Sequence, residues 1–331
     1  MDPTRRASDR PPIHLVTGAG SGIGWAVVQA LAQAGHHVIG GARRDEDLAR
    51  LAQLPRVTPL RLDLLDPAAP DAVLAVLHDG GFEALDGLVN NAGIGELGHL
   101  AAWRDDDMQR LFETNVFGLM RLTRALLPAL LAARGRVVNV GSMGGSITQP
   151  LYGPYTMSKF ALEAYSDCLR QECAPHGVHV AIVQPGAVAT RIGASAGAAN
   201  AARLRATPPP FDADALRVLQ AFEATAAPDA PDSADAPESA IHRKPASPEA
   251  VAAVVLQALT EPQPQARYLT GTRWEGERVL RALTERLIDA ATSPGQRLDR
   301  EALLAWVEAA WRERFEGAGS GATGNPGDLV R

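Results

Sequence analysis

The sequence feature that most constrains the fold is a glycine-rich turn near the start of the chain. Residues 13–17 form a short apolar run before the turn, and apolar residues recur at helical spacing after it until Gly35. A strand that leads through glycines into a helix presents free backbone N–H groups and the positive end of the helix dipole to an anion. The usual Gly-x-Gly-x-x-Gly spacing does not fit. The spacing that fits is Thr-Gly-x-x-x-Gly-x-Gly, on Thr17, Gly18, Gly22 and Gly24. In this context a merely flexible turn has little support, so the turn is predicted to bind the phosphates of a dinucleotide.

Short apolar runs alternate with segments of helical periodicity along most of the chain. The expected strands are residues 13–17, 37–41, 57–62, 85–89, 136–140, 178–183 and 266–270. Strands that alternate with helices predict a parallel sheet covered on both faces. Pro59 cannot donate a ladder hydrogen bond, so the third strand is expected at the sheet edge. The predicted fold class is α/β, a Rossmann-type doubly wound parallel sheet with flanking helices in a single domain.

The second expected strand ends in Ala42-Arg43-Arg44, a position that selects the cofactor in dinucleotide-binding folds. An acidic residue there binds the ribose 2′-hydroxyl of NAD(H), whereas an arginine accommodates the 2′-phosphate of NADP(H). Ala42 occupies the acidic position, and guanidinium recognises phosphate well. Arg43 therefore favours NADP(H). NAD(H) stays open, because Arg43 or Arg44 is alternatively a solvated loop charge.

Polar residues and turn formers follow the expected strands at their carboxyl ends. Asn91 follows the fourth strand, Ser142 the fifth and Pro185-Gly186 the sixth. Ligands of doubly wound sheets bind beyond these ends, so the three positions predict one site. Asn115 lies in the middle of a long predicted helix, residues 105–133, where asparagine costs helix propensity. A role in the site and a simple interhelical hydrogen bond are equally compatible with that position.

Tyr155 and Lys159 are four residues apart after Pro154, a residue suited to the first turn of a helix. Both side chains then lie on one helix face, where an ammonium favours the phenolate and lowers the pKa of a tyrosine toward neutrality. Such a tyrosine exchanges a proton with an alcohol or ketone oxygen. An isolated pair of this kind is more often a surface tyrosine above a solvated lysine. Here only Lys159 and Lys244 are lysines among 32 basic residues, which favours a functional lysine.

Together these motifs resemble those of the classical short-chain dehydrogenase/reductase family. The matching residues, in chain order, are Thr17, Gly18, Gly22, Gly24, Asp63, Asn90, Asn91, Ala92, Gly93, Asn115, Ser142, Tyr155, Lys159, Pro185, Gly186 and Thr190. The resemblance implies a catalytic tetrad. Tyr155 would be the general acid/base, and Lys159 would lower its pKa and bind the nicotinamide ribose. Ser142 would hydrogen-bond the substrate oxygen, and Asn115 would hold a water for proton relay.

The resemblance also implies how the cofactor is bound. Asp63 and Asn91 would contact its adenosine side, and residues 185–190 would lie near the nicotinamide. The implied cofactor-binding residues are Gly18, Ser21, Gly22, Ile23, Gly24, Arg43, Asp63, Leu64, Asn91, Ala92, Gly93, Tyr155, Lys159, Pro185, Gly186, Val188 and Thr190. No metal is expected. These roles hold cofactor and carbonyl in register while a proton reaches the developing alkoxide.

The likeness is weaker after Thr190, where residues 193–246 are expected to form a substrate lid. Helices are expected near residues 192–206 and 212–227, and Leu216, Leu219 and Phe222 would line the pocket. The Pro-, Asp- and Ala-rich stretch 228–245 buries little and is expected to be disordered, and the whole lid is expected to be mobile without substrate. Residues 153–163 and 247–271 are similar to the 17β-hydroxysteroid and retinol dehydrogenase branch, which implies a bulky lipophilic alcohol or ketone.

The expected organisation is a disordered tail, a catalytic domain and an added C-terminal segment. The boundaries are residues 1–12, 13–292 and 293–331. In the last segment, Leu303, Val307, Trp311 and Phe315 form one helical stripe that is expected to pack on its own domain or on a partner subunit. Its acidic polar face does not suit a membrane surface.

Composition and charge argue against several classes of protein. The net charge is −6 without a basic block, which argues against nucleic acid as a partner. No uncharged apolar run is long enough to span a membrane, and residues 1–12 lack the apolar core of a signal peptide. Cys168 and Cys173 are expected to be reduced thiols. We therefore expect a cytoplasmic protein that acts on a small molecule. A homodimer or homotetramer is expected as well.

The sequence predicts an NADP(H)-dependent oxidoreductase that interconverts a ketone or aldehyde and an alcohol, on a steroid-like, retinoid-like or other apolar substrate. Two alternatives stay open. A 3-oxoacyl-thioester reductase acting on an acidic carrier would need a basic patch near the lid, for which Arg191, Arg203 and Arg205 are available. A non-catalytic NADPH-sensing regulator would be expected to lack Tyr155 or Lys159, and both are present.

Overall fold

The computed structural model describes residues 10–190, 196–225 and 245–315, without the side chains of residues 222–225. The chain divides into two compact units, residues 1–279 and 280–331. The second unit begins inside a helix and not at residue 293, the boundary that the sequence predicted.

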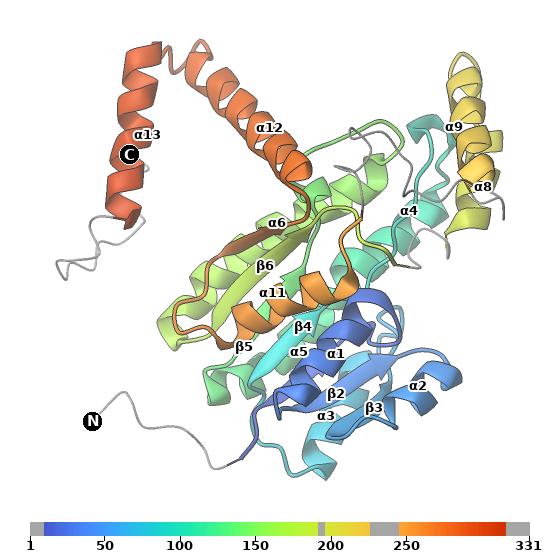
Figure 1. Cartoon of the computed structure of the whole chain (residues 1–331), viewed down its shortest axis with the longest axis vertical. Helices are drawn as coiled ribbons and strands as arrows, with labels where there is room; N and C mark the ends of the chain where they lie inside the picture. Colours follow the sequence, from blue (N-terminus) through green and yellow to red (C-terminus); the bar gives the residue numbers. More distant parts are fainter. Residues whose placement is uncertain (1–9, 191–195, 226–244, 316–331) are drawn as a thin grey trace. The chain divides into compact units, whose positions relative to one another are not determined.

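A seven-stranded sheet, parallel throughout, forms the centre of the first unit, with strand order β3-β2-β1-β4-β5-β6-β7 (Figure 1). The strands are β1 (Ile13–Val16), β2 (His37–Ala42), β3 (Val57–Arg61), β4 (Gly87–Asn90), β5 (Arg136–Val140), β6 (His179–Pro185) and β7 (Arg267–Thr270). The predicted fold class is confirmed, and β3 lies at the edge, where Pro59 pairs with Gly40. The order reverses between β1 and β4, which opens a crevice for ligands at their carboxyl ends.

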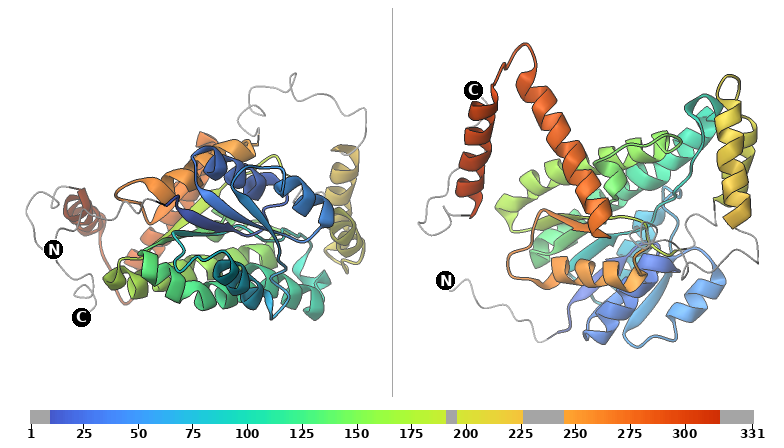
Figure 2. Two further views of the ribbon diagram at one scale, coloured as in Figure 1. Left: turned by 90° about the horizontal axis from the view of Figure 1, so that it is seen from below. Right: turned by 45° about the horizontal axis from the view of Figure 1, so that its top comes forward.

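Two helix layers cover the two faces of the sheet (Figure 2). On one face lie α1 (Gly22–Gln33), α2 (Asp45–Leu51) and α11 (Pro248–Thr260), and on the other α3 (Ala69–Asp79), α5 (Gly118–Ala133) and α6 (Gly153–Cys173). Buried aliphatic side chains fill both interfaces: Val28 and Val255 belong to the first core and Leu122 and Leu162 to the second. Ser247 caps α11 by accepting a hydrogen bond from the Ala250 N–H, as its place before Pro248 indicates.

The predicted long helix 105–133 is present but is not uniform. It consists of α4 (Asp105–Phe112), a π-helical turn (Glu113–Phe117) that contains Asn115, and α5. By length and mean hydropathy this stretch is the one candidate membrane span among the described residues. Leu119, Leu122 and Leu126 are nevertheless buried against the sheet, the pattern of a core helix in a globular protein.

The lid region contains two helices that pack on each other, α8 (Gly197–Arg205) and α9 (Asp212–Thr225) (Figure 1). Residues 191–195 and 226–244 lie outside the described chain, so the predicted disorder of 228–245 falls there almost entirely. Ala246 lies within the described chain and pairs with Val188. The last residue of the predicted lid therefore belongs to the scaffold.

Two segments near the ends of the chain differ from the sequence prediction. Arg10, assigned to the disordered tail, forms an ion pair of 2.7 Å with Asp86, and the Pro12 carbonyl accepts a hydrogen bond from the His37 N–H. Helix α12 (Arg273–Thr292) has no counterpart among the predicted elements, because its many charged residues and Gly276 weaken the apolar periodicity.

The second unit contains the end of α12 and α13 (Arg300–Phe315). In α13 the predicted apolar stripe is largely exposed, since Val307, Trp311 and Phe315 have 40%, 61% and 59% of their surfaces accessible. Its packing on a partner subunit stays a prediction.

Candidate active site

The glycine turn has the geometry of an anion-binding loop. Gly18 and Gly22 have positive φ values, +65° and +54°, that other residues rarely adopt, and a Cβ at Gly24 would lie 2.2 Å from the Gly18 carbonyl oxygen. No side chain caps the start of α1 at Ser21, so the N–H groups of its first turn, including that of Ile23, face the carboxyl edge of the sheet.

Two strand ends are tied together beside this turn. The Thr17 hydroxyl oxygen accepts hydrogen bonds from the N–H groups of Asn91 and Ala92, at 3.0 and 2.9 Å. The Asn91 side chain donates in return to the Thr17 carbonyl at 2.9 Å. The sequence predicted Asn91 as a direct adenosine contact. In the structure its side-chain amide donates to the carbonyls of Thr17 and Gly18, which holds the loop after β4 against the glycine turn, and the adenosine contact stays a prediction.

The segment after β6 passes over the glycine turn. A Cβ at Gly22 would lie 3.0 Å from the Thr190 Cγ2 atom, which places Thr190 against the start of α1. Val188 is held through the backbone pairing of its neighbours Ala187 and Ala189 with Ala246. Residues 185–190 and the glycine turn thus border the same crevice, as predicted.

The two arginines after β2 have different environments. Arg44 makes two hydrogen bonds to the buried carboxylate of Asp47, at 2.8 and 3.1 Å. The side chain of Arg43 is 62% exposed, and its one ion pair among the described residues is with Asp63, at 3.9 Å. Arg43 is therefore the arginine that is able to reach a ligand, and Arg44 is the one committed to the scaffold.

Leu64, the other predicted residue on this side, is buried in the core with 4% of its surface accessible. Any contact with a cofactor is limited to its backbone.

Asp47 and Arg50 also belong to this region, and the sequence did not single them out. Asp47 lies so close to the turn that a Cβ at Gly20 would meet its Oδ2 atom at 2.6 Å. Arg50 donates to the Gly20 carbonyl and lies 4.1 Å from the centre of the Trp25 ring. Nothing in the local pattern distinguishes this pair from ordinary helix-surface charges.

The side chains of Tyr155 and Ser142 are neighbours at one wall of a cavity. Ser142 also accepts a hydrogen bond of 3.0 Å from the Gly144 N–H, which fixes its hydroxyl group. Burial raises the pKa of Tyr155, and the neighbouring Ser142 hydroxyl group partly offsets that shift. The sequence predicted a lowered pKa, and that prediction is wrong.

The reason lies in where Lys159 is placed. Its Nζ atom donates a 3.0 Å hydrogen bond to the Val140 carbonyl and is 5.8 Å from the centre of the Tyr155 ring. Burial lowers the pKa of Lys159 to about 8, and the nearby Glu163 carboxylate partly opposes that shift. The ammonium is thus directed at the backbone of β5 and not at the phenol oxygen.

Glu163 is a further residue that the sequence analysis missed. It follows Lys159 by one helical turn, and its carboxylate accepts hydrogen bonds from Gln184 at 2.8 Å and Arg267 at 3.0 Å. Burial raises the pKa of Glu163, against the effect of these two partners. The four-residue spacing from Lys159 is the one sequence signal that points to it.

Asn115 is tied to the same helix. Its side chain exchanges hydrogen bonds of 2.9 Å with the backbone of Ile94 and donates to the Ser158 hydroxyl at 3.1 Å. Ser158 in turn donates to the Tyr155 carbonyl at 2.7 Å. A Cβ at Gly93 would lie 3.2 Å from the Asn115 Oδ1 atom, so Gly93 permits the close approach. Asn115 thus makes an interhelical hydrogen bond, to Ser158, and its role in the site stays a prediction.

A cavity of about 690 Å³ begins at Tyr155 and Ser142. Its walls are mostly apolar, with Leu97, Met143, Ile147, Leu204, Leu219 and Trp274 among the lining residues. Of the three lid residues predicted to line it, Leu219 does so and Leu216 is 43% exposed outside it. The side chain of Phe222 lies outside the described residues.

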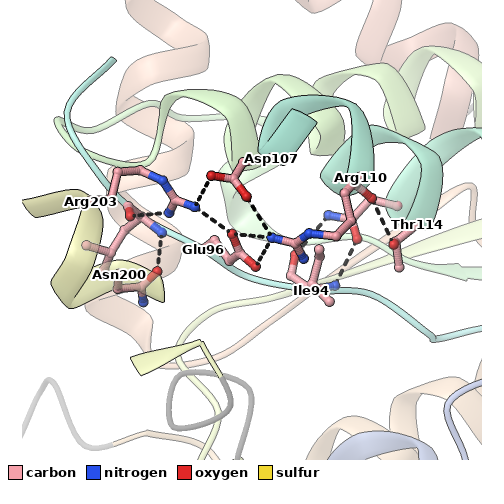
Figure 3. A network of polar contacts seen from close by, with 9 residues as sticks. Ile94, Glu96, Asp107, Arg110, Thr114, Asn200 and Arg203 are labelled. Atoms are coloured by element: carbon pink, nitrogen blue, oxygen red, sulfur yellow. Dashed lines mark hydrogen bonds and ion pairs between the residues drawn. The ribbon is translucent and has the colours of Figure 1, made fainter. Parts of the chain in front are cut away.

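A buried network of ion pairs anchors the lid beside this cavity (Figure 3). Glu96 accepts hydrogen bonds from Arg110 at 2.9 Å and from Arg203 at 3.0 Å. Arg203 also donates to the Leu97 carbonyl at 2.9 Å, and Asn200 accepts from the Leu97 N–H at 3.0 Å. Helix α8 is thus attached to the loop after β4 by hydrogen bonds and an ion pair, and the mobility of the lid without substrate stays a prediction.

Arg203 does not contribute to a basic surface patch of the kind that an acidic carrier would need. Only 3% of its side chain is exposed, and its charge is matched by Glu96 and Asp107. Arg191 lies outside the described chain.

The sequence from residue 12 to residue 201 matches the family model of the short chain dehydrogenase. The chain belongs to the short-chain dehydrogenase family, a family of oxidoreductases. Its glycine turn, Ser142, Tyr155 and Lys159 all fall within the matched residues.

Relatives of this short-chain dehydrogenase agree with it over about half of its length. It is 38% identical over 182 residues to "Uncharacterized oxidoreductase YbbO" of Escherichia coli strain K12, covering 54% of this chain and 66% of that protein. It is 43% identical over 177 residues to "Retinol dehydrogenase 5" of Mus musculus, covering 52% and 55%. The chain therefore spans between half and two thirds of the length of these relatives.

A solved structure extends the likeness to nearly the whole chain. The short-chain dehydrogenase from Streptomyces avermitilis is 28% identical, with a TM-score of 0.67, and the match covers 94% of this chain and 100% of that one.

Proposed function

We propose that this short-chain dehydrogenase is an NADP(H)-dependent oxidoreductase that interconverts an apolar ketone or aldehyde and the corresponding alcohol. The observation that carries the proposal is the Tyr155–Ser142 pair at the wall of an apolar cavity, beside the crevice of the glycine turn. A carbonyl oxygen that accepts hydrogen bonds from both hydroxyl groups would have a proton donor and a polarising donor in place.

The residues of the crevice fit a dinucleotide. The turn has no room for a Cβ at Gly18, Gly20 or Gly24, and it would present the N–H groups of α1 to a pyrophosphate. Arg43, exposed and only loosely paired, would accommodate a 2′-phosphate. When bound, the cofactor supplies or accepts a hydride. The protein's own part is to hold the carbonyl, exclude water and move the proton.

Tyr155 would carry the proton. Burial keeps its pKa high, so the phenol is protonated at neutral pH, which is the form that donates to a ketone oxygen. Ser142 would hold the same oxygen. Lys159 would support the developing phenolate when a ligand draws its ammonium away from Val140.

The apolar walls of the cavity favour a lipophilic substrate, in line with the name of the retinol dehydrogenase relative. The buried and paired Arg203 weakens the alternative of a thioester on an acidic carrier. We place this activity in the cytoplasm and on a homodimer or homotetramer, as the sequence predicted.

A panel of apolar ketones, aldehydes and alcohols, each assayed with NADPH and NADH by the absorbance of the reduced nicotinamide, tests the proposal. We expect turnover of bulky apolar ketones, faster with NADPH at subsaturating cofactor. Absence of turnover with every member of the panel, while NADPH binding is retained, would contradict it.

A further inference from the structure

The cavity beside Tyr155 has three charged residues in its lining, Glu96, Glu275 and Arg278. An ionised group on the wall of an apolar cavity is costly unless something pairs with it. The partners of these three residues therefore indicate what kind of ligand the cavity accepts.

Both carboxylates are committed to the protein. Glu96 is held by Arg110 and Arg203, as Figure 3 shows. Glu275 accepts hydrogen bonds from the Ala187 N–H at 2.7 Å and from the N–H and hydroxyl groups of Thr272, both at 2.9 Å. Neither carboxylate needs a cationic ligand.

The contacts of Glu275 also fix where Arg278 lies. They attach the first turn of α12 to the segment after β6, which itself borders the cavity. Arg278 follows Glu275 by three residues and Trp274 by four, so it lies on the same face of α12 one turn later. Arg278 belongs to the first unit, and its position there is set by the hydrogen bonds of Glu275, one of which is to Ala187 in the cavity wall.

Arg278 has no ion pair of its own among the described residues. Its guanidinium lies 4.8 Å from the centre of the Trp274 ring. Stacking on an aromatic face orders the guanidinium and leaves its N–H groups, which point outward in the plane, available to an anion. Its exposure places it at the solvent side of the cavity, whereas Tyr155 and Ser142 mark the reacting side.

We propose that the substrate is an apolar oxo or hydroxy acid whose terminal carboxylate binds Arg278, while its carbonyl or alcohol carbon lies at Tyr155. The proposal rests on the function proposed above and assigns Arg278 as a specificity-determining residue. A carboxylate at the solvent side keeps part of its hydration, and the apolar body fills the remainder of the cavity.

The kinetic test uses methyl-ketone acids of increasing chain length, each compared with its methyl ester, which keeps the body and removes the charge. At saturating NADPH we expect the wild type to prefer the best acid over its ester by about tenfold in kcat/KM, the value of one charge-assisted contact. Arg278→Gln should bring that ratio close to unity by raising KM for the acid and leaving kcat. The matched control is Arg273→Gln, on the same helix, because Arg273 is paired with Glu277 and does not line the cavity. It should keep the wild-type ratio.

A binding measurement separates this proposal from the proposed reaction. Calorimetric titration of a saturated alkanoate and of the matching alkanol, without oxidised cofactor, involves no chemistry. We expect the alkanoate to bind more tightly, and Arg278→Gln to remove the difference. Equal acid and ester kinetics in the wild type, or a preference that survives in Arg278→Gln, would overturn the anion site and leave the proposed reaction standing. Arg278-dependent alkanoate binding without turnover of any ketone would support the anion site and overturn the reaction.

Discussion

At the residue scale, the structure changes how the tyrosine and lysine are understood. The two residues share a helix face as their spacing predicts, yet the ammonium of Lys159 is hydrogen-bonded to Val140 and the pKa of Tyr155 is raised by burial. The spacing could predict proximity but not the direction of a lysine side chain, which depends on a carbonyl in a different strand. The protonated phenol is the form needed to reduce a ketone.

The first prediction is that Tyr155→Phe lowers kcat by about 10²–10⁴-fold, the usual contribution of a positioned acid. The substitution removes the hydroxyl group and keeps the ring, so NADPH affinity, measured by fluorescence titration, should stay within about twofold of wild type. A variant that retains more than a few per cent of wild-type activity would contradict the assigned role.

The second prediction concerns the cofactor and uses two adjacent arginines with different environments. Arg43→Ala should weaken NADPH binding by about 10- to 100-fold and NADH binding little, because a charge-assisted contact contributes roughly 1.5–3 kcal/mol. Arg44→Ala is the matched control. It breaks the pair with Asp47 beside the glycine turn and should affect both cofactors equally. Equal losses of NADPH and NADH affinity in Arg43→Ala would show that Arg43 is only a solvated loop charge.

At the element scale, the lid is the part of the molecule that the sequence predicted least well. Helices at α8 and α9 were expected, but their attachment was not, since Glu96 and Arg203 are separated by 107 residues and no local pattern pairs them. A buried ion pair contributes little net stability compared with apolar packing, but removing one partner is costly. The network therefore indicates a specific position for α8, and with it Leu204 in the cavity wall.

The third prediction follows from that position. Arg203→Met releases α8 while Glu96 keeps Arg110, so the buried carboxylate is not left unpaired. We expect KM for an apolar ketone to rise by about fivefold or more, with NADPH affinity unchanged, as expected for the loss of a substrate-positioning element.

Two further variants make the result specific. Arg203→Lys keeps the charge and should recover part of the KM. Arg217→Met, on the exposed side of α9, removes only a surface pair with Asp214 and should behave as wild type. A fall in melting temperature with no change in KM would show that the network is structural only.

At the scale of the whole molecule, fold class and strand order were predictable because they depend on local signals. The glycine turn, the apolar runs and Pro59 each constrain one element, and chain connectivity then leaves few arrangements. Helix α12 was missed for the converse reason. Its capping residues Thr272 and Glu275 follow the usual pattern, but its buried contacts are few and its surface is charged. Glu275 and Ala187 are 88 residues apart in the sequence, so their hydrogen bond cannot be predicted from a short segment of it.

The last prediction concerns stability in acid and also belongs to the whole chain. His14 lies in β1 at the centre of the sheet, stacked on His36 with their nitrogen atoms 2.8 Å apart. Burial lowers the pKa of His14 to about 3, with smaller effects from His36 and Arg10. The native protein therefore keeps His14 neutral, whereas the unfolded chain binds a proton as the pH falls below 6.5. The free energy of unfolding must then decrease between pH 6.5 and 3, by about 2 kcal/mol at pH 5 from this group alone.

His14→Leu removes this proton uptake, so its melting temperature should fall less between pH 7 and pH 5 than that of the wild type, whatever its value at pH 7. His78→Leu is the control, because His78 is exposed at the end of α3 and should show the wild-type pH dependence. Scanning calorimetry at the two pH values measures both. If His14→Leu and the wild type lose stability in parallel, the acid sensitivity of the fold comes from groups other than His14.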